Sequence, residues 1–175
     1  SLPSRGLGDV YKRQMHDVGK ISVPESILDK PGKLTDEEWE VMKLHTTAGY
    51  NLLISGAGDI TNLAAIIANE HHERWDGEGY PNGKAADEIH LFARITAVAD
   101  VFDALLSARC YKEPWPLEMV VDLFERECGR QFDPELAKLL LNHLPEFVAI
   151  RDTYPDSSNS ESAALAATTQ QANCA

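Results

Sequence analysis

Histidines and aspartates that are expected to point into the protein interior constrain this chain more than any other feature. They occur in four separate segments, namely His16-Asp17, His45, His71-His72 and Asp100. Burying several ionisable groups together is costly unless a cation or hydrogen bonds offset the lost hydration. The fold must therefore bring these segments together, and metal ions are the expected reason for their burial.

Residue types that favour helices dominate the sequence. Leu, Ala, Glu, Ile and Met recur in the 175-residue chain, whereas alternating β-branched residues are scarce. Hydrophobic residues make up 43% of the chain, which is enough for one core, and the length suits one domain. These features predict an all-α domain.

Local signals place the helices and the main loop. Thr35 and Glu38 form a capping-box pattern, Asp133 and Pro134 mark another helix start, and residues 73–86 are rich in turn-forming types. A further helix is expected over residues 89–107. The helical period predicts these inward positions: Trp39, Met42, Gly49, Leu52 and Leu53; Ile60, Leu63, Ala64 and Ile67; Ala93, Ala97 and Ala104; Leu117, Val120, Val121, Phe124 and Cys128; Leu136, Leu139 and Leu140.

The charge balance and the cysteines exclude several classes of protein. The formal net charge is −12, and an acidic surface argues against binding nucleic-acid polymers or inserting into anionic membranes. Cys110, Cys128 and Cys174 show no metal-ligand spacing, which indicates free thiols and a cytoplasmic location. An anionic substrate must then be held by metal ions and a few well-placed cations.

The inward residues suit transition metals. Imidazole and carboxylate without thiolate favour iron, manganese or zinc, and six ligands exceed what one tetrahedral ion uses. Two adjacent ions bridged by a carboxylate such as Asp17 are therefore expected. Adjacent histidines on a helix point about 100° apart, so His71 and His72 can both bind metal only near a helix end.

Three stretches resemble one known family. His16-Asp17-Val18-Gly19-Lys20 is an HD pair followed by a lysine, and HHERWDGEGYPNG at residues 71–83 resembles the long HD-GYP motif. Residues 92–112 are similar to the helix that follows this motif. The resemblance to HD-GYP domains runs from about Met15 to Pro134 and implies an HD-superfamily helical bundle with a GYP loop between helices.

The resemblance also implies an enzyme. HD-GYP domains are metal-dependent phosphodiesterases of bacterial second-messenger signalling that hydrolyse cyclic di-GMP to linear pGpG, with GMP as a further product. Two divalent ions, iron or manganese with zinc as an alternative, are implied to bind His16, Asp17, His45, His71, His72 and Asp100. Asp17 and Lys20 are the implied catalytic residues, and Lys20, Tyr80, Arg109 and Lys112 are the implied contacts to substrate. The GYP loop is also expected to bind partner proteins.

The chain departs from the family before the HD pair. Family domains carry upstream helices with a further histidine ligand, whereas residues 1–14 contain neither histidine nor glutamate. We therefore expect a non-family leader over residues 1–14, an HD-GYP domain lacking its first helices over residues 15–151, and a disordered tail over residues 152–175. Water would replace the missing ligand, and apolar surface left by the missing helices favours a homodimer.

Two alternatives to a cyclic di-GMP phosphodiesterase stay open at this point. One is an HD phosphohydrolase that acts on another nucleotide, and the other is a catalytically impaired module that binds ligand or partner proteins without turnover. Product analysis separates the first alternative from the main hypothesis, and metal content with turnover separates the second.

Overall fold

The structure, a computed structural model, describes residues 15–56, 58–107 and 114–153. These residues form α-helices, two 3-10 helices (η1 and η2) and the loops that join them. In chain order the elements are η1 (Val18–Ser22), α2 (Glu25–Leu28), α3 (Asp36–Ile54), α4 (Asp59–Glu70), η2 (Ala86–Glu88), α5 (Leu91–Leu106), α6 (Leu117–Arg126), α7 (Pro134–Asn142) and α8 (Leu144–Thr153). No strand occurs within these ranges, so the predicted all-α fold is confirmed.

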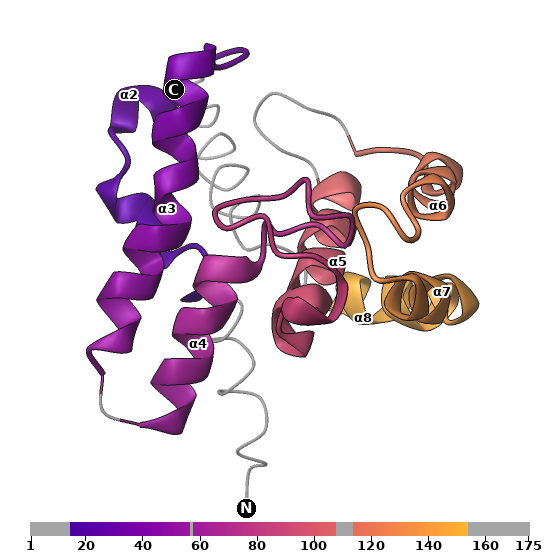
Figure 1. Cartoon of the computed structure of the whole chain (residues 1–175). Coiled ribbons are helices and arrows are strands. Elements are labelled where there is room, and N and C mark those ends of the chain that lie inside the picture. The colour runs from indigo at the N-terminus through magenta and orange to yellow at the C-terminus, as the bar shows by residue number, and fades with distance from the viewer. Residues whose placement is uncertain (1–14, 57, 108–113, 154–175) are drawn as a thin grey trace, which may run out of the picture. The chain divides into compact units, whose positions relative to one another are not determined.

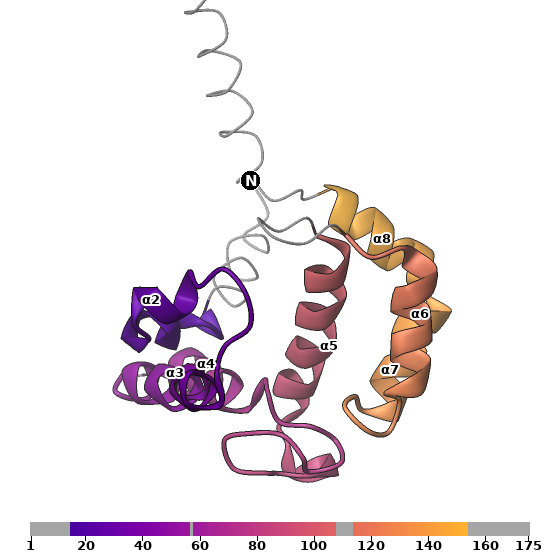
Figure 2. The ribbon, with the colours of Figure 1, turned by 90° about the horizontal axis from the view of Figure 1, so that it is seen from above.

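The elements up to α6 pack against one another in pairs. Helices α3 and α4 pack side by side, and η1 lies against α3 (Figure 1). Helix α5 contacts α4 on one side and α6 on the other (Figure 2). In the described ranges, none of the helices has the length and apolar character needed to cross a membrane.

Aromatic side chains build the core between α5, α6 and α7. Phe124 of α6 stacks on Phe132, with ring centroids 4.4 Å apart, and meets Phe102 of α5 edge-on at 6.4 Å. Leu140 of α7 is also buried. At the start of α7, the Asp133 carboxylate accepts a hydrogen bond from the Glu135 amide, as the N-cap prediction requires.

The capping box predicted at the start of α3 is present. The Glu38 amide donates to the Thr35 hydroxyl at 3.3 Å, and the Thr35 amide donates to the Glu38 carboxylate at 2.7 Å. This pair satisfies two amides that the first helical turn leaves without backbone partners. It fixes where α3 begins and therefore which of its side chains point inward.

The predicted inward face of α3 is wrong in part. Trp39 and Leu52 are 46% and 54% exposed, whereas the buried residues of α3 are His45, Thr46 and Gly49. Two other predicted core residues are also exposed, Ile60 of α4 and Leu139 of α7. On α3, small side chains decide the packing face because they allow the backbones of neighbouring elements to approach closely.

Gly19 is the clearest case of such an approach. A Cβ atom added there would lie 1.9 Å from the His45 carbonyl oxygen and 2.5 Å from the Gly49 amide nitrogen. Gly49 in turn faces the Ala68 side chain of α4. The three segments that carry His16-Asp17, His45 and His71-His72 are therefore held together by contacts that only small residues permit.

Two buried carboxylates hold the long loop after α4. Glu73 accepts hydrogen bonds from the amides of Asn82 (2.7 Å) and Lys84 (3.0 Å). Glu70 accepts from the Lys84 ammonium (2.6 Å) and from the His90 amide (2.7 Å). Both residues are at least 95% buried, so the loop returns to the helix that precedes it at fixed points.

The chain divides into two compact units after Leu141, and α8 belongs to the second unit. Sequence analysis predicted no separate helix there. The His143 carbonyl accepts hydrogen bonds from the amides of Glu146 and Phe147, and Pro145 occupies the first turn, where a missing N–H is tolerated.

Several predictions fall on residues outside the described ranges. The predicted leader, residues 1–14, lies there entirely, and the predicted tail, residues 152–175, does so apart from its first two residues, which end α8. Cys110 and Cys174 are also outside the described residues, and Cys128 is a free thiol.

Replacing Gly19 with alanine tests the close contact between η1 and α3. We expect Gly19→Ala to lower the free energy of unfolding by about 3 kcal/mol or more, the upper end of the range for overpacking, because the obstacle is backbone. Urea unfolding followed by circular dichroism measures the change. Gly32→Ala is the control, since Gly32 has open space around it but a φ of +123°, so backbone strain alone should cost about 1–2 kcal/mol. Equal losses of unfolding free energy in the two variants would contradict a close contact between Gly19 and the backbone of α3.

Replacing Glu73 with glutamine tests the anchoring of the loop. A glutamine has one acceptor oxygen, so its NH₂ group would face the second backbone amide and leave it unsatisfied. We expect Glu73→Gln to cost about 1–3 kcal/mol of stability in the same unfolding assay. Glu118→Gln, which removes the same charge from an exposed position in α6, should change stability by less than about 0.5 kcal/mol.

Candidate metal centre

Four of the predicted metal ligands form a tight cluster. Asp17, His45, His71 and His72 each offer one ligand atom, and these atoms all lie within 4.8 Å of one another. Asp17 directly precedes η1, His45 lies in the middle of α3, and the histidine pair follows the last residue of α4. The expectation that adjacent histidines act together near a helix end therefore agrees with their position.

His16 and Asp100 adjoin this cluster. The buried His16 ring has its Nε2 atom 3.3 Å from Asp17 Oδ2 and 3.8 Å from Asp100 Oδ1 of α5. Its ring centroid lies 4.9 Å from that of His71. All six residues predicted as metal ligands are thus brought to one place, which we call the metal centre.

Backbone carbonyls orient two of the imidazoles. The Nδ1 atom of His45 lies 2.6 Å from the Met42 carbonyl oxygen, and Nδ1 of His71 lies 2.9 Å from that of Ala68. An imidazole can bond to a carbonyl only by donating a proton, so Nδ1 carries the hydrogen in both rings. The Nε2 atoms are left with lone pairs, which is the arrangement of metal-binding histidines.

Burial keeps the imidazoles neutral. Burial, together with the charges of the neighbouring histidines, lowers the pKa of His71 to about 2 and that of His72 to about 3. Burial also lowers the pKa of His45. At neutral pH these three side chains are therefore uncharged, as a metal ligand must be.

Asp17 supplies negative charge in the middle of the centre. Burial alone would raise the pKa of its carboxyl, but hydrogen bonds from His16 and Lys20 and the charge of Lys20 hold that pKa well below its usual range. Lys20 Nζ donates to Asp17 Oδ2 at 2.7 Å. Asp17 is therefore ionised, and the half-exposed Lys20 ammonium lies beside it.

This donor set fits a divalent cation. Asp17 Oδ1 is buried and accepts no hydrogen bond from any residue that the structure describes. It faces Nε2 of His45 at 3.6 Å and Nε2 of His71 at 3.8 Å, and the two Nε2 atoms are 3.4 Å apart. Lone pairs and a carboxylate that face one another repel, and a cation between them removes the repulsion.

Tyr80 of the loop covers one side of the centre. Its ring stacks on His72 with a centroid distance of 4.9 Å and an interplanar angle of 26°, and its amide donates to the His72 carbonyl. Burial raises the pKa of Tyr80, so its phenol stays protonated. Arg109 and Lys112, the other predicted substrate contacts, lie outside the described residues.

Sequence reasoning missed the residues that support the centre. Glu70 and Glu73 flank the histidine pair and anchor the loop that carries Tyr80. Their spacing of three residues around His71-His72 was a usable signal, because it places both carboxylates on the same side of the helix end. Trp39 was predicted to be a core residue, and Lys43 was given no role. Both lie against the Tyr80 ring.

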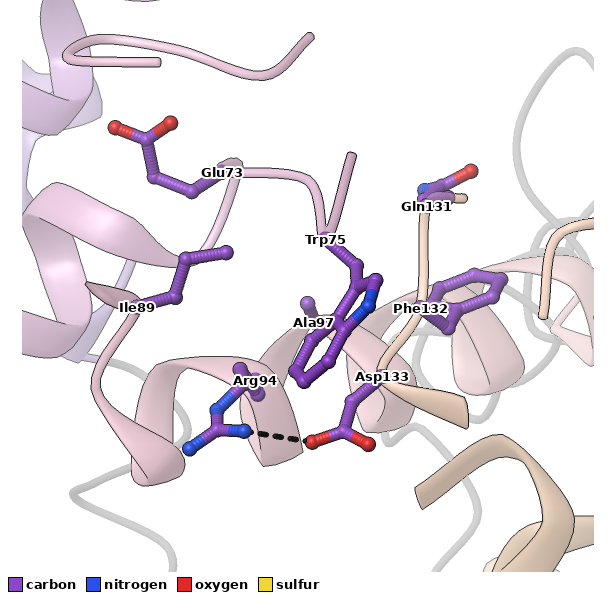
Figure 3. Close-up of a pocket in the computed structure, with 8 residues that line it drawn as sticks. All are labelled: Glu73, Trp75, Ile89, Arg94, Ala97, Gln131, Phe132 and Asp133. Atoms are coloured by element: carbon purple, nitrogen blue, oxygen red, sulfur yellow. Dashed lines mark hydrogen bonds and ion pairs between the residues drawn. The ribbon is translucent and has the colours of Figure 1, made fainter. Parts of the chain in front are cut away.

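A small pocket is lined in part by Glu73 (Figure 3). It is formed where the loop at Trp75 meets the start of α5 and residues 131–133, and it is crossed by the ion pair between Arg94 and Asp133 at 2.8 Å. Arg94 also lies over the Trp75 ring. The eight residues that line the pocket include no predicted metal ligand or substrate contact. The pocket is therefore a packing junction between the loop and the helices.

Comparisons with known proteins agree with the geometry. Residues 10–136 match the family model described as "HD domain". The chain is 48% identical over 142 residues to 3'3'-cGAMP-specific phosphodiesterase 2 of Vibrio cholerae, covering 81% of this chain and 27% of that protein. It is 51% identical over 127 residues to the cyclic di-GMP phosphodiesterase response regulator RpfG of Xanthomonas campestris, covering 73% and 34%. It is 45% identical over 142 residues to a cyclic di-GMP phosphodiesterase of Thermotoga maritima, covering 78% and 39%.

The matches extend over most of this chain but over less than half of each of these relatives. The match to the family model includes the HD pair, the segment of His45 and the long loop, because all of these lie within residues 10–136. The chain therefore belongs to the HD domain family, as the resemblance of its motifs to HD-GYP proteins predicted.

Proposed function

We propose that this chain is a metal-dependent phosphodiesterase module that hydrolyses cyclic di-GMP to linear pGpG, with GMP as a further product. The observation that carries the proposal is the metal centre, in which neutral imidazoles and one ionised carboxylate face one another without a neutralising proton. The names of the relatives support a cyclic dinucleotide as the substrate class.

The six residues would hold two divalent ions, iron or manganese with zinc as an alternative. The orientation of Asp17 supports this number, because its Oδ1 atom faces His45 and His71 whereas its Oδ2 atom faces His16. Asp17 would thus lie between one position near His45, His71 and His72 and another near His16 and Asp100. Bound divalent ions supply Lewis acidity and a nucleophile derived from water at neutral pH.

The protein's own cations would hold the substrate. Lys20 is 44% exposed at its side chain, so its ammonium can shift from Asp17 toward a phosphate and stabilise the charge that develops there. Tyr80 presents a protonated phenol at the edge of the centre, and Arg109 and Lys112 would contact phosphate or guanine. Such local contacts are needed because the chain as a whole has a net charge of −12 and repels anions.

A second candidate substrate is 3'3'-cGAMP. It is favoured by the relative from Vibrio cholerae whose name specifies that nucleotide and which is 48% identical to this chain. The two substrates differ in one purine base and share the phosphodiester that the metal centre would act on. The remaining expectations, a GYP loop that binds partner proteins and a homodimer, stay predictions.

Metal analysis combined with turnover tests the proposed function. We expect protein purified without chelators to contain about two equivalents of divalent metal and to convert cyclic di-GMP to the linear dinucleotide. Mass spectrometry of the metals and chromatography of the products measure both, with 3'3'-cGAMP assayed in parallel. Full metal loading without turnover of either nucleotide would instead establish a binding module.

Replacing Asp17 with asparagine tests its role as the central ligand. We expect Asp17→Asn to weaken Mn²⁺ binding by at least about 100-fold, since even supporting residues around metal ligands contribute about 10–100-fold. Isothermal titration with Mn²⁺ measures the affinity without any need for activity. Asp29→Asn removes the same charge from an exposed position outside the centre and should bind Mn²⁺ like the unchanged protein. Equal affinities in all three proteins would rule out Asp17 as a ligand.

A further inference from the structure

An exposed tryptophan lies at the rim of the metal centre. Trp39 of α3 is 46% exposed, although it follows the start of its helix by a single turn and has a large apolar surface. Its ring meets the Tyr80 ring edge to face, with centroids 6.0 Å apart and an interplanar angle of 80°. The packing of α3 on its neighbours uses His45, Thr46 and Gly49, so the exposed part of the indole is not part of that contact.

Trp39 and Tyr80 continue a row of rings that begins at the centre. The Tyr80 ring stacks on His72, which belongs to the metal-binding cluster, and Trp39 is the next aromatic side chain outward from Tyr80. A ligand whose phosphodiester lies at the cluster would therefore extend toward these rings. Solvent-exposed aromatic faces stack nucleobases, and such stacking contributes substantially to nucleotide affinity.

A positive charge accompanies the two rings. Lys43 lies one helical turn after Trp39, and its Nζ atom is 5.9 Å from the centroid of the Tyr80 ring. On a chain with a net charge of −12, an ammonium at this position lowers the local repulsion of an anionic ligand. The same ammonium also pairs with Glu40 at 2.7 Å, which fixes its place on the outer face of α3.

We propose that Trp39 and Tyr80 form an aromatic ledge that stacks one purine base of the cyclic dinucleotide while its phosphodiester occupies the metal centre. Lys43 supports the ledge by its charge. This inference rests on the proposed function and adds a residue that determines substrate affinity. Stacking depends on the π-face that every base has, so the ledge accepts guanine and adenine alike and favours a nucleotide over a phosphodiester without a base.

Kinetics with two substrates test the ledge. An analogue of cyclic di-GMP with hydrogen in place of both bases contains the phosphodiester but no aromatic face, whereas cyclic di-GMP contains both. We expect Trp39→Leu to raise KM for cyclic di-GMP by about 10-fold, since stacking contributions of this size are typical, with kcat nearly unchanged. The kinetic constants for the base-free analogue, measured by chromatography of its products, should not change. Trp39→Phe should restore most of the affinity, because it keeps an aromatic face.

Controls separate stacking from a structural role of the indole. Leu52→Ala truncates another exposed apolar side chain of α3 and should leave all kinetic constants unchanged. Trp39→Leu could instead lower the thermal midpoint of unfolding and reduce kcat/KM for both substrates equally. In that case Trp39 only stabilises the position of the loop, and the ledge is disproved. An unchanged KM for cyclic di-GMP would place the base elsewhere and also disprove it.

Direct binding distinguishes failure of the ledge from failure of the proposed function. The Kd for cyclic di-GMP is measured by isothermal titration calorimetry on the metal-loaded protein, and it should rise about 10-fold in Trp39→Leu. If the unchanged protein binds cyclic di-GMP without hydrolysing it, the proposed function fails. The ratio of the two Kd values, Trp39→Leu to unchanged protein, still shows whether the aromatic ledge binds the base. If the unchanged protein does not bind cyclic di-GMP at all, the ledge is disproved as well.

Discussion

The ionised carboxylate of Asp17 is the group on which the rest of the structure depends. It lies among imidazoles that burial keeps neutral, and its Oδ1 atom faces the Nε2 lone pairs of His45 and His71. Carbonyl groups fix the opposite nitrogen of both rings, so a shift of tautomer cannot relieve the repulsion. A cation can, and this requirement explains why side chains from separate segments converge on one point.

Small residues make that convergence geometrically possible. Gly19 lies against the backbone of α3, and Gly49 of α3 lies against Ala68 of α4, so three ligand-bearing segments approach more closely than larger side chains would allow. The same arrangement buries little of the bulky apolar surface of α3. Trp39 and Leu52 are left on the outside as a consequence, and one of them then becomes available at the rim of the centre.

The chemistry of the site could be predicted from sequence more fully than its surroundings. The six candidate ligands were found because a buried histidine or aspartate needs a compensating partner, and the capping box at Thr35 was found because it is a local pattern. Helical periodicity placed Gly49 inward correctly but failed for Trp39 and Leu52, since it ranks positions by hydrophobicity whereas close backbone contact decides which face of α3 is buried. Glu73 was missed because its partners are amides of a loop whose path no local pattern specifies.

Two different kinds of interaction would then serve one anionic ligand on an acidic chain. Charge attraction would come from the metal centre and from ammonium groups such as Lys20 and Lys43, because the chain as a whole carries a net charge of the same sign as the ligand. Stacking on Trp39 and Tyr80 adds affinity without requiring any further positive charge. It acts on the base, which carries no charge, so affinity can increase without making the protein attractive to nucleic-acid polymers.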